Sequence, residues 1–117
     1  MAPFTVPVDA SPQLGQNPAM DSQAVIDRLS QSSADLKAMG LQHLSVFGST
    51  ARGEALPGSD VDLAVTLDKR ARIDLFRFAA INERIARLLG VDVDIVVEPA
   101  RNQRVQAEID RDRLRVY

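Results

Sequence analysis

A short segment, residues 48–65, constrains this chain more than any other part of its sequence. It reads GSTARGEALPGSDVDLAV, with a Gly-Ser pair, a Pro-Gly break and two aspartates separated by one apolar residue. Side chains two residues apart on a β-strand point to the same face, about 6–7 Å apart along the strand. Asp60 and Asp62 therefore share one face of a predicted strand, and Val61 and Leu63 lie on the other. Carboxylates this close repel each other unless a divalent cation lies between them, which predicts a metal site.

The spacing of apolar residues on both sides of this segment predicts the other elements. Helical spacing predicts helices over residues 22–39 and 73–89, each followed by a glycine, and Pro99 is suited to begin a last helix. Strand-like apolar runs predict three strands, over residues 41–47, 59–67 and 91–97. This order of elements predicts an α/β (α+β) fold in which a small mixed sheet is flanked by helices.

The helix predicted over residues 73–89 carries the clearest core stripe. Phe76, Phe78, Ile81 and Ile85 are expected to be buried, whereas the arginines scattered around the same helix are expected to face water. His43 is the single histidine, and we interpret it as a strand side chain packed under a helix rather than as a catalyst.

The composition excludes several classes of protein. The chain has 117 residues, which suits one domain, and 45% of them are apolar, which is enough for a core. It has no cysteine, so disulfides and thiolate metal ligands are excluded and a reducing compartment, the cytoplasm, is expected. The net charge of −2, without a block of basic residues, does not favour nucleic-acid binding. No apolar run approaches the ~20 residues that span a bilayer, so no membrane association is expected.

Residues 1–20 differ in composition from the rest of the chain. They contain four prolines, one charged side chain and no apolar periodicity. Neither the basic start nor the apolar stretch of a secretory signal is present. We therefore expect a flexible N-terminal tail over residues 1–20 and one domain over residues 21–117. A further hypothesis is that translation begins at Met20, which opens the first periodic segment.

Two more aspartates lie on the third predicted strand. In the run VDVDIVV, Asp92 and Asp94 share one face. Strand alternation therefore does not decide which of the two completes a site with Asp60 and Asp62.

Three pieces of the sequence resemble the signature of the minimal nucleotidyltransferases, the smallest members of the DNA polymerase beta superfamily. The pieces are Gly48-Ser49, Ala51-Arg52-Gly53 and Ser59-Asp60-Val61-Asp62-Leu63. The resemblance covers about residues 21–117, and it implies a nucleotidyltransferase core, a nucleoside triphosphate donor (most often ATP) and two Mg²⁺ ions. Such ions activate an attacking oxygen and neutralise the charge of the leaving pyrophosphate.

The resemblance also implies the roles of the aspartates. Asp60 and Asp62 are the expected metal ligands and catalytic residues. In the family, the third aspartate lies in a Val-Asp-hydrophobic-Val run before a proline-started helix, and residues 93–96 match that run. Asp94 is therefore expected to complete the metal site and to act as the general base.

Five residues around the Gly-Ser turn are the expected nucleotide-binding residues: Gly48, Ser49, Arg52, Gly53 and Ser59. Gly48 allows the backbone to approach a phosphate closely, and the Ser49 hydroxyl with nearby backbone N–H groups can hold the β- and γ-phosphates.

The other three of these residues have alternative roles. Arg52 either neutralises phosphate charge or forms an ion pair with Glu54 or Asp60. Gly53 permits the turn out of a short helix, and Ser59 either orients Asp60 or contacts the nucleotide.

Minimal nucleotidyltransferases of this kind are often antitoxins that attach AMP to a tyrosine of a HEPN toxin, a small helical ribonuclease. The resemblance therefore implies AMPylation of a partner-protein hydroxyl within a toxin–antitoxin system. A domain of this length leaves no room for an acceptor-binding domain, so the acceptor is expected on a separate macromolecule. The protein is accordingly expected to form a hetero-oligomer with that partner or a homodimer.

Two alternatives remain open. The same fold can act as a non-catalytic nucleotide- or partner-binding antitoxin that inhibits by occlusion, although the three carboxylates argue against this. The chain can also be a small-molecule nucleotidyltransferase, for example for an aminoglycoside, although the absence of a second domain argues against that.

Overall fold

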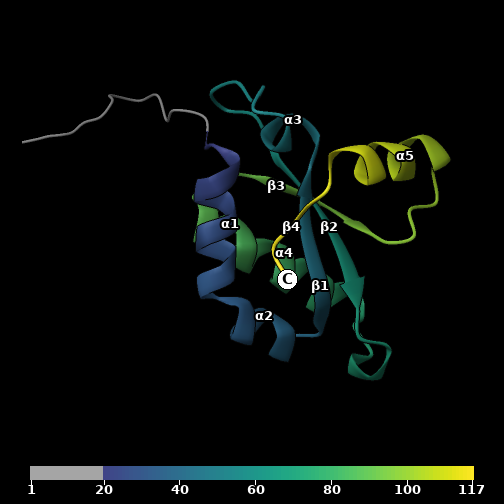
Figure 1. Ribbon diagram of the computed structural model, residues 1–117. Coiled ribbons are helices and arrows are strands. Elements are labelled where there is room, and N and C mark those ends of the chain that lie inside the picture. Colours follow the sequence, from purple (N-terminus) through teal and green to yellow (C-terminus); the bar gives the residue numbers. More distant parts are fainter. Residues whose placement is uncertain (1–19) are drawn as a thin grey trace, which may run out of the picture.

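The computed structural model of the protein describes residues 20–117 (Figure 1). The predicted tail lies outside the described residues except for Met20, and a start of translation at Met20 stays a prediction. The helices are α1 (Ser22–Gln31), α2 (Ser33–Ala38), α3 (Gly48–Ala51), α4 (Leu75–Leu89) and α5 (Gln103–Asp112), with a 3₁₀ turn, η1, over Lys69–Ala71. The strands are β1 (Leu41–Phe47), β2 (Val61–Leu67), β3 (Val93–Val97) and a short β4 (Leu114–Arg115) that was not predicted. Within residues 20–117, no helix is both long and apolar enough to cross a membrane.

The four strands form one mixed sheet in the order β3-β2-β1-β4. Strand β1 pairs antiparallel with both β2 and β4, whereas β2 and β3 are parallel. Helices α1, α2 and α4 pack on one face of the sheet and α5 packs on the other. Figure 1 shows α1 and α5 on opposite sides of the strands. The predicted α/β class with a small mixed sheet and flanking helices is therefore confirmed.

The larger core lies between the sheet and helices α1, α2 and α4. Val25 and Leu29 of α1 and Ile81 and Ile85 of α4 are fully buried against strand residues such as Leu63. The spacing of four residues within each pair places both side chains on the stripe that faces the sheet. Each buried Leu or Ile side chain contributes about 2 kcal/mol, so this layer supplies most of the stability.

The smaller core lies under α5. It contains three buried residues, Phe47, Ala64 and Ile109. Polar contacts supplement it: the Arg113 guanidinium donates to both carboxylate oxygens of Glu98, at 2.9 and 2.6 Å. The position of α5 therefore depends on a charged pair as well as on apolar packing.

Several predicted helix and strand boundaries are wrong. The helix predicted over residues 22–39 breaks at Ser32 into α1 and α2, because serines compete for backbone hydrogen bonds and favour helix ends. The last helix does not begin at Pro99. Its N-cap is Asn102, whose side chain accepts from the N–H groups of Arg104 and Val105 at 2.8 and 3.4 Å. Strands β2 and β3 each begin two residues later than predicted.

Three side chains that were expected to be buried are not, and of these Phe78 is half-buried. Phe76 is 86% exposed, because it lies off the stripe of α4 that carries the buried Ile81 and Ile85. His43 is exposed as well. The packing under α5 reaches Phe47 at the far end of β1, so no helix covers His43.

Candidate functional site

Two of the three predicted aspartates come from adjacent parallel strands. Asp62 on β2 is in register with Asp94 on β3. Neighbouring strands lie about 4.8 Å apart, and residues in register point to the same face. Asp62 and Asp94 therefore stand side by side on the face where Ala64 packs under α5. Asp60 immediately precedes β2 and is exposed.

The negative charges around Asp62 alter its ionisation. The pKa of Asp62 is raised to about 6, first by burial and then by the charges of Asp94, Glu108 and Asp60. The positive charge of Arg52 acts in the opposite direction. This environment disfavours the ionised carboxylate, and a bound cation would reverse the effect.

The ligand types on this face fit Mg²⁺, but the side chains are not closed around one point. Mg²⁺ prefers oxygen ligands, and all three predicted ligands are carboxylates. Among residues 20–117, no three histidine, cysteine, aspartate or glutamate side chains lie close enough together to hold one ion. Like charges repel, so carboxylates without a cation between them stay apart.

The Gly-Ser turn lies directly against the aspartates. Gly48 has a φ of +74°, and a Cβ atom at this position would collide with the Oδ2 atom of Asp62. Only glycine tolerates both the left-handed backbone and this close approach. Ser49 follows it at the start of α3 and is half-buried. The fold therefore brings Gly48, Ser49 and Asp62 to one place.

Arg52 is paired with acidic side chains. Its Nε donates to Glu54 at 2.9 Å, and its Nη1 donates to Asp112 at 2.7 Å. Hydrogen bonds from Arg111 and then from Arg52 lower the pKa of Asp112 to about 2. Of the ion pairs predicted for Arg52, the one with Glu54 is present, and none with Asp60 occurs within residues 20–117.

The other two predicted nucleotide-binding residues shape the loop before β2. Gly53 has a φ of +72° and open space where a Cβ would lie, so its role here is the turn itself. Ser59 is half-buried, and its Oγ accepts a hydrogen bond from the N–H of Leu56 at 3.1 Å. This bond fixes the loop that leads into Asp60.

Two acidic residues on α5 lie near the site and were not predicted. Glu108 lies 3.7 Å from Arg52 and is one of the charges that raise the pKa of Asp62. Asp112, one helical turn later, holds Arg52 in place. The four-residue spacing of the two acids is visible in the sequence. Their contact with Arg52, however, joins positions about 60 residues apart, which no local pattern reveals.

The chain is also similar to known proteins in sequence and in fold. Residues 27–116 match the family model described as the nucleotidyltransferase domain, and this range includes the Gly-Ser turn and all three aspartates. The chain belongs to this nucleotidyltransferase family. The predicted resemblance is therefore confirmed, and so is the predicted enzyme class, a nucleotidyltransferase.

Individual relatives of this nucleotidyltransferase agree with the assignment. The protein adenylyltransferase MntA of Thermococcus cleftensis is 33% identical over 73 residues, which make up 62% of this chain and 72% of that protein. A solved structure described as a minimal nucleotidyltransferase is 32% identical, with a TM-score of 0.69, and the match covers 84% of this chain and 98% of that one.

A more distant match is a chain from the complex of a tri-AMPylated Shewanella oneidensis HEPN toxin with its MNT antitoxin. It is 18% identical with a TM-score of 0.57, and the match covers 79% of this chain and 71% of that one. At this identity, the likeness establishes the shared fold alone.

Proposed function

We propose that this nucleotidyltransferase transfers AMP from ATP to a hydroxyl group of a partner protein, in a reaction that requires Mg²⁺. The observation that carries the proposal is the register of Asp62 with Asp94 across the parallel strands, with the Gly-Ser turn in contact with Asp62. Two neighbouring carboxylates beside a glycine turn at the start of a helix are groups that transfer from a nucleoside triphosphate can use.

The residues have separate roles in this proposal. Asp60, Asp62 and Asp94 would hold Mg²⁺, which, when bound, neutralises triphosphate charge and makes the acceptor hydroxyl more acidic. Gly48 and Ser49 hold the β- and γ-phosphates through backbone N–H groups and the serine hydroxyl.

The reaction forms one bond and breaks one bond. The acceptor oxygen bonds to the α-phosphorus of ATP, and the bond from that phosphorus to the bridging oxygen of the leaving group breaks, which releases pyrophosphate. Asp94 takes the proton of the acceptor hydroxyl. Arg52 contributes positive charge to the phosphates only if they draw it away from Glu54 and Asp112.

The partner in the proposal is a HEPN-type toxin, so that the protein is the antitoxin of the pair and acts in the cytoplasm. Support comes from the similarity to a protein adenylyltransferase, MntA, and from the fold shared with a chain of a HEPN toxin–MNT antitoxin complex. The absence of cysteine fits a reducing compartment.

The test is transfer of labelled AMP from ATP to the protein encoded next to this one. The wild-type protein with Mg²⁺ is expected to label the partner, and an Asp60→Ala/Asp62→Ala variant is expected to lose labelling. Asp27→Ala is a matched control, because Asp27 is a carboxylate of α1 on the opposite side of the sheet from the site. Full labelling by the double variant would reject the mechanism.

A non-catalytic role is the second candidate, and one observation favours it. Arg52 is engaged by Glu54 and Asp112, and no ready-made ion site exists within residues 20–117. In this reading the protein inhibits its partner by covering it. Inhibition of the purified partner without ATP or Mg²⁺ would support it, and inhibition that requires both would exclude it.

A further inference from the structure

One edge of the sheet is open along β3. This strand ends the strand order, so β2 pairs with one side of it, and no strand within residues 20–117 pairs with the other side. The opposite edge is formed by β4, which has two residues, whereas β3 has five. An unpaired edge presents backbone N–H and C=O groups to which another extended segment can bind. The β3 edge is therefore the longer of the two places where this sheet can accept a further strand.

The backbone groups that face the open edge can be identified from the hydrogen bonds between β3 and β2. The Asp92 carbonyl oxygen accepts from the Val61 N–H at 3.0 Å, and the Glu98 N–H donates to the Val65 carbonyl oxygen at 2.8 Å. In a parallel pair of strands, alternate residues direct both of their backbone groups to the same neighbouring strand. The even-numbered residues of 92–98 therefore bond to β2. The backbone groups of the odd-numbered residues, 93, 95 and 97, point to the open edge.

The side chains of β3 hold the strand in place, while these outer backbone groups stay available. Val93 and Ile95 pack against the larger core, on the α4 face of the sheet, and Val97 is 38% exposed. Within residues 20–117, no backbone hydrogen bond from a turn, loop or cap reaches the N–H or C=O groups of these three residues. The edge is therefore a fixed row of donors and acceptors.

The same strand carries Asp94, the proposed base. Asp94 is exposed and in register with Asp62, and both stand on the α5 face of the sheet. A strand added at the open edge would continue this row, with its backbone about 4.8 Å beyond that of β3. A side chain opposite Asp94 on the added strand would point to the same face, beside the Asp94 carboxylate.

The order of groups along this row suits the proposed reaction. The Gly-Ser turn follows β1 and lies against Asp62, so it is on the side of Asp62 away from Asp94. In phosphoryl-type transfer the attacking and leaving oxygens lie roughly in line, on opposite sides of the phosphorus. An acceptor at the β3 edge and pyrophosphate at the Gly-Ser turn would approach and leave from opposite sides.

The charge of the edge argues against a second copy of this chain as its occupant. If two β3 strands paired antiparallel, centring the pair on any of residues 93–96 would place one acidic residue opposite another. The facing pairs would be Asp92 with Asp94, Asp94 with itself, Asp92 with Glu98, or Asp94 with Glu98. Like charges directly opposite each other on paired strands are destabilising. A segment without acidic residues meets no such repulsion.

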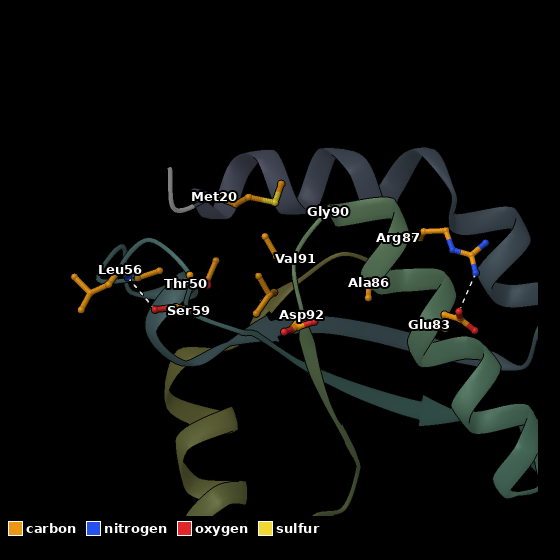
Figure 2. A pocket seen from close by; sticks show the side chains of 13 residues that line it. Met20, Thr50, Leu56, Ser59, Glu83, Ala86, Arg87, Gly90, Val91 and Asp92 are labelled. Atoms are coloured by element: carbon orange, nitrogen blue, oxygen red, sulfur yellow. Dashed lines mark hydrogen bonds and ion pairs between the residues drawn. The ribbon is translucent and has the colours of Figure 1, made fainter. Parts of the chain in front are cut away.

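The α4 face of the sheet is hollow beside the start of β3. A cavity of about 590 Å³ opens there, and it is lined by Val91, Asp92 and residues of α4 such as Ala86 (Figure 2). Side chains of an added strand alternate between the two faces of the sheet. The hollow leaves room for those that point to the α4 face.

We propose that the acceptor segment of the partner protein binds in an extended conformation along the β3 edge, antiparallel to β3, with its hydroxyl residue opposite Asp94. The inference rests on the proposed AMP transfer for the identity of that residue. Antiparallel pairing is favoured because it is slightly more stable per residue than parallel pairing. The residues on either side of the acceptor residue exchange hydrogen bonds with Val93 and Ile95 and face α4, so apolar β-branched residues suit these positions.

The test is NMR of the full-length protein with the peptide acetyl-Ser-Val-Tyr-Val-Ser-amide at millimolar concentration, without ATP. The peptide is expected to shift the amide signals of Val93 and Ile95 more than that of Asp94, because only the first two N–H groups face the edge.

Two methylated forms of this peptide give a matched comparison in which the protein stays unchanged. Methylation of both valine nitrogens removes the N–H groups that face β3 and is expected to weaken binding about tenfold, through two lost hydrogen bonds. Methylation of the tyrosine nitrogen and the last serine nitrogen adds the same number of methyl groups. Because these two nitrogens face away from β3, binding of that form is expected to be unchanged.

The outcomes separate this inference from the proposed function. Absence of binding, shifts centred outside β3, equal binding of the two methylated forms, or weaker binding of the tyrosine-methylated form would each overturn the inference. If the peptide binds at β3 as expected but Mg²⁺ and ATP give no AMP transfer to peptide or partner, the edge assignment stands and the proposed function fails. AMP transfer to the partner without peptide binding at β3 would leave the proposed function standing and overturn the edge assignment.

Discussion

The charged pair of Glu98 and Arg113 should be a main determinant of the stability of the α5 side of the protein. The pair is bidentate, with N–O distances of 2.9 and 2.6 Å, and the two side chains are only 14% and 28% exposed. Gln106 of α5 donates to the same carboxylate at 2.8 Å, and Arg113 donates to Ser45 of β1 at 3.2 Å. Glu98 therefore connects the end of β3, α5 and β1.

The magnitude follows from the burial of the pair. Exposed ion pairs contribute about 0–1 kcal/mol, and breaking a fully buried pair is unfavourable by about 3–5 kcal/mol. Because this pair is partly buried, we expect Glu98→Ala to lower the free energy of unfolding by about 2 kcal/mol at pH 7. Arg113→Ala should lower it by a similar amount. In a double-mutant cycle, the double variant should lose less than the sum, by about 1–2 kcal/mol.

The pH dependence of this coupling has a definite sign. The pKa of Glu98 is lowered from 4.5, first by the hydrogen bond from Arg113. Its contribution to stability is therefore present above 4.5 and is lost as the pH falls through the lower value of the folded protein. Urea unfolding of the four proteins of the cycle at pH 7 and at acidic pH measures this. A coupling energy near zero at pH 7, or one that grows in acid, would show that the Glu98–Arg113 pair does not stabilise the fold in this way.

Three further predictions concern the site and the core. Gly48→Ala is expected to lower the free energy of unfolding in urea by about 2 kcal/mol or more and to abolish AMP transfer, because a Cβ atom collides with Asp62 in addition to the backbone strain. Gly58→Ala is the control: Gly58 has a φ of +83° and no atom near its Cβ position, so only the strain of about 1 kcal/mol is expected. In EDTA, Asp62→Asn is expected to raise the thermal unfolding midpoint at pH 8 and to change it little at pH 4. The pKa of Asp62 is raised to about 6, so its ionisation destabilises the folded state as the pH rises. A lower midpoint for the variant at pH 8 would contradict this. Ile85→Ala should lower the free energy of unfolding by about 3 kcal/mol, and Phe76→Ala by less than about 0.5 kcal/mol, because only Ile85 is buried; similar losses would show that Phe76 packs in solution.

The sequence allowed the strand that carries Asp62 and the helix α4 to be predicted because the signals there are local. Alternation places Asp60 and Asp62 on one face, and the stripe of Ile81 and Ile85 marks α4. The break at Ser32 was missed because apolar spacing continues across it, although the local serines favour a helix end.

Contacts between residues far apart in the sequence could not be predicted from local sequence patterns. Asp92 and Asp94 share a face in the sequence, and only the register of β3 on β2 shows that Asp94 stands beside Asp62. The pairing of Arg52 with Asp112 depends on how α5 crosses the sheet, which no periodicity reveals.

The proposed reaction depends on Asp60, Asp62 and Asp94 forming one metal site next to the Gly-Ser turn. The most direct measurement is the paramagnetic broadening of amide NMR signals by Mn²⁺, a substitute for Mg²⁺, in the presence of ATP. The signals of Gly48, Asp62 and Asp94 are expected to broaden first, and Asp62→Asn is expected to abolish this broadening. Broadening that centres elsewhere in the protein, or that persists in the Asp62→Asn variant, would show that these aspartates do not form the metal site.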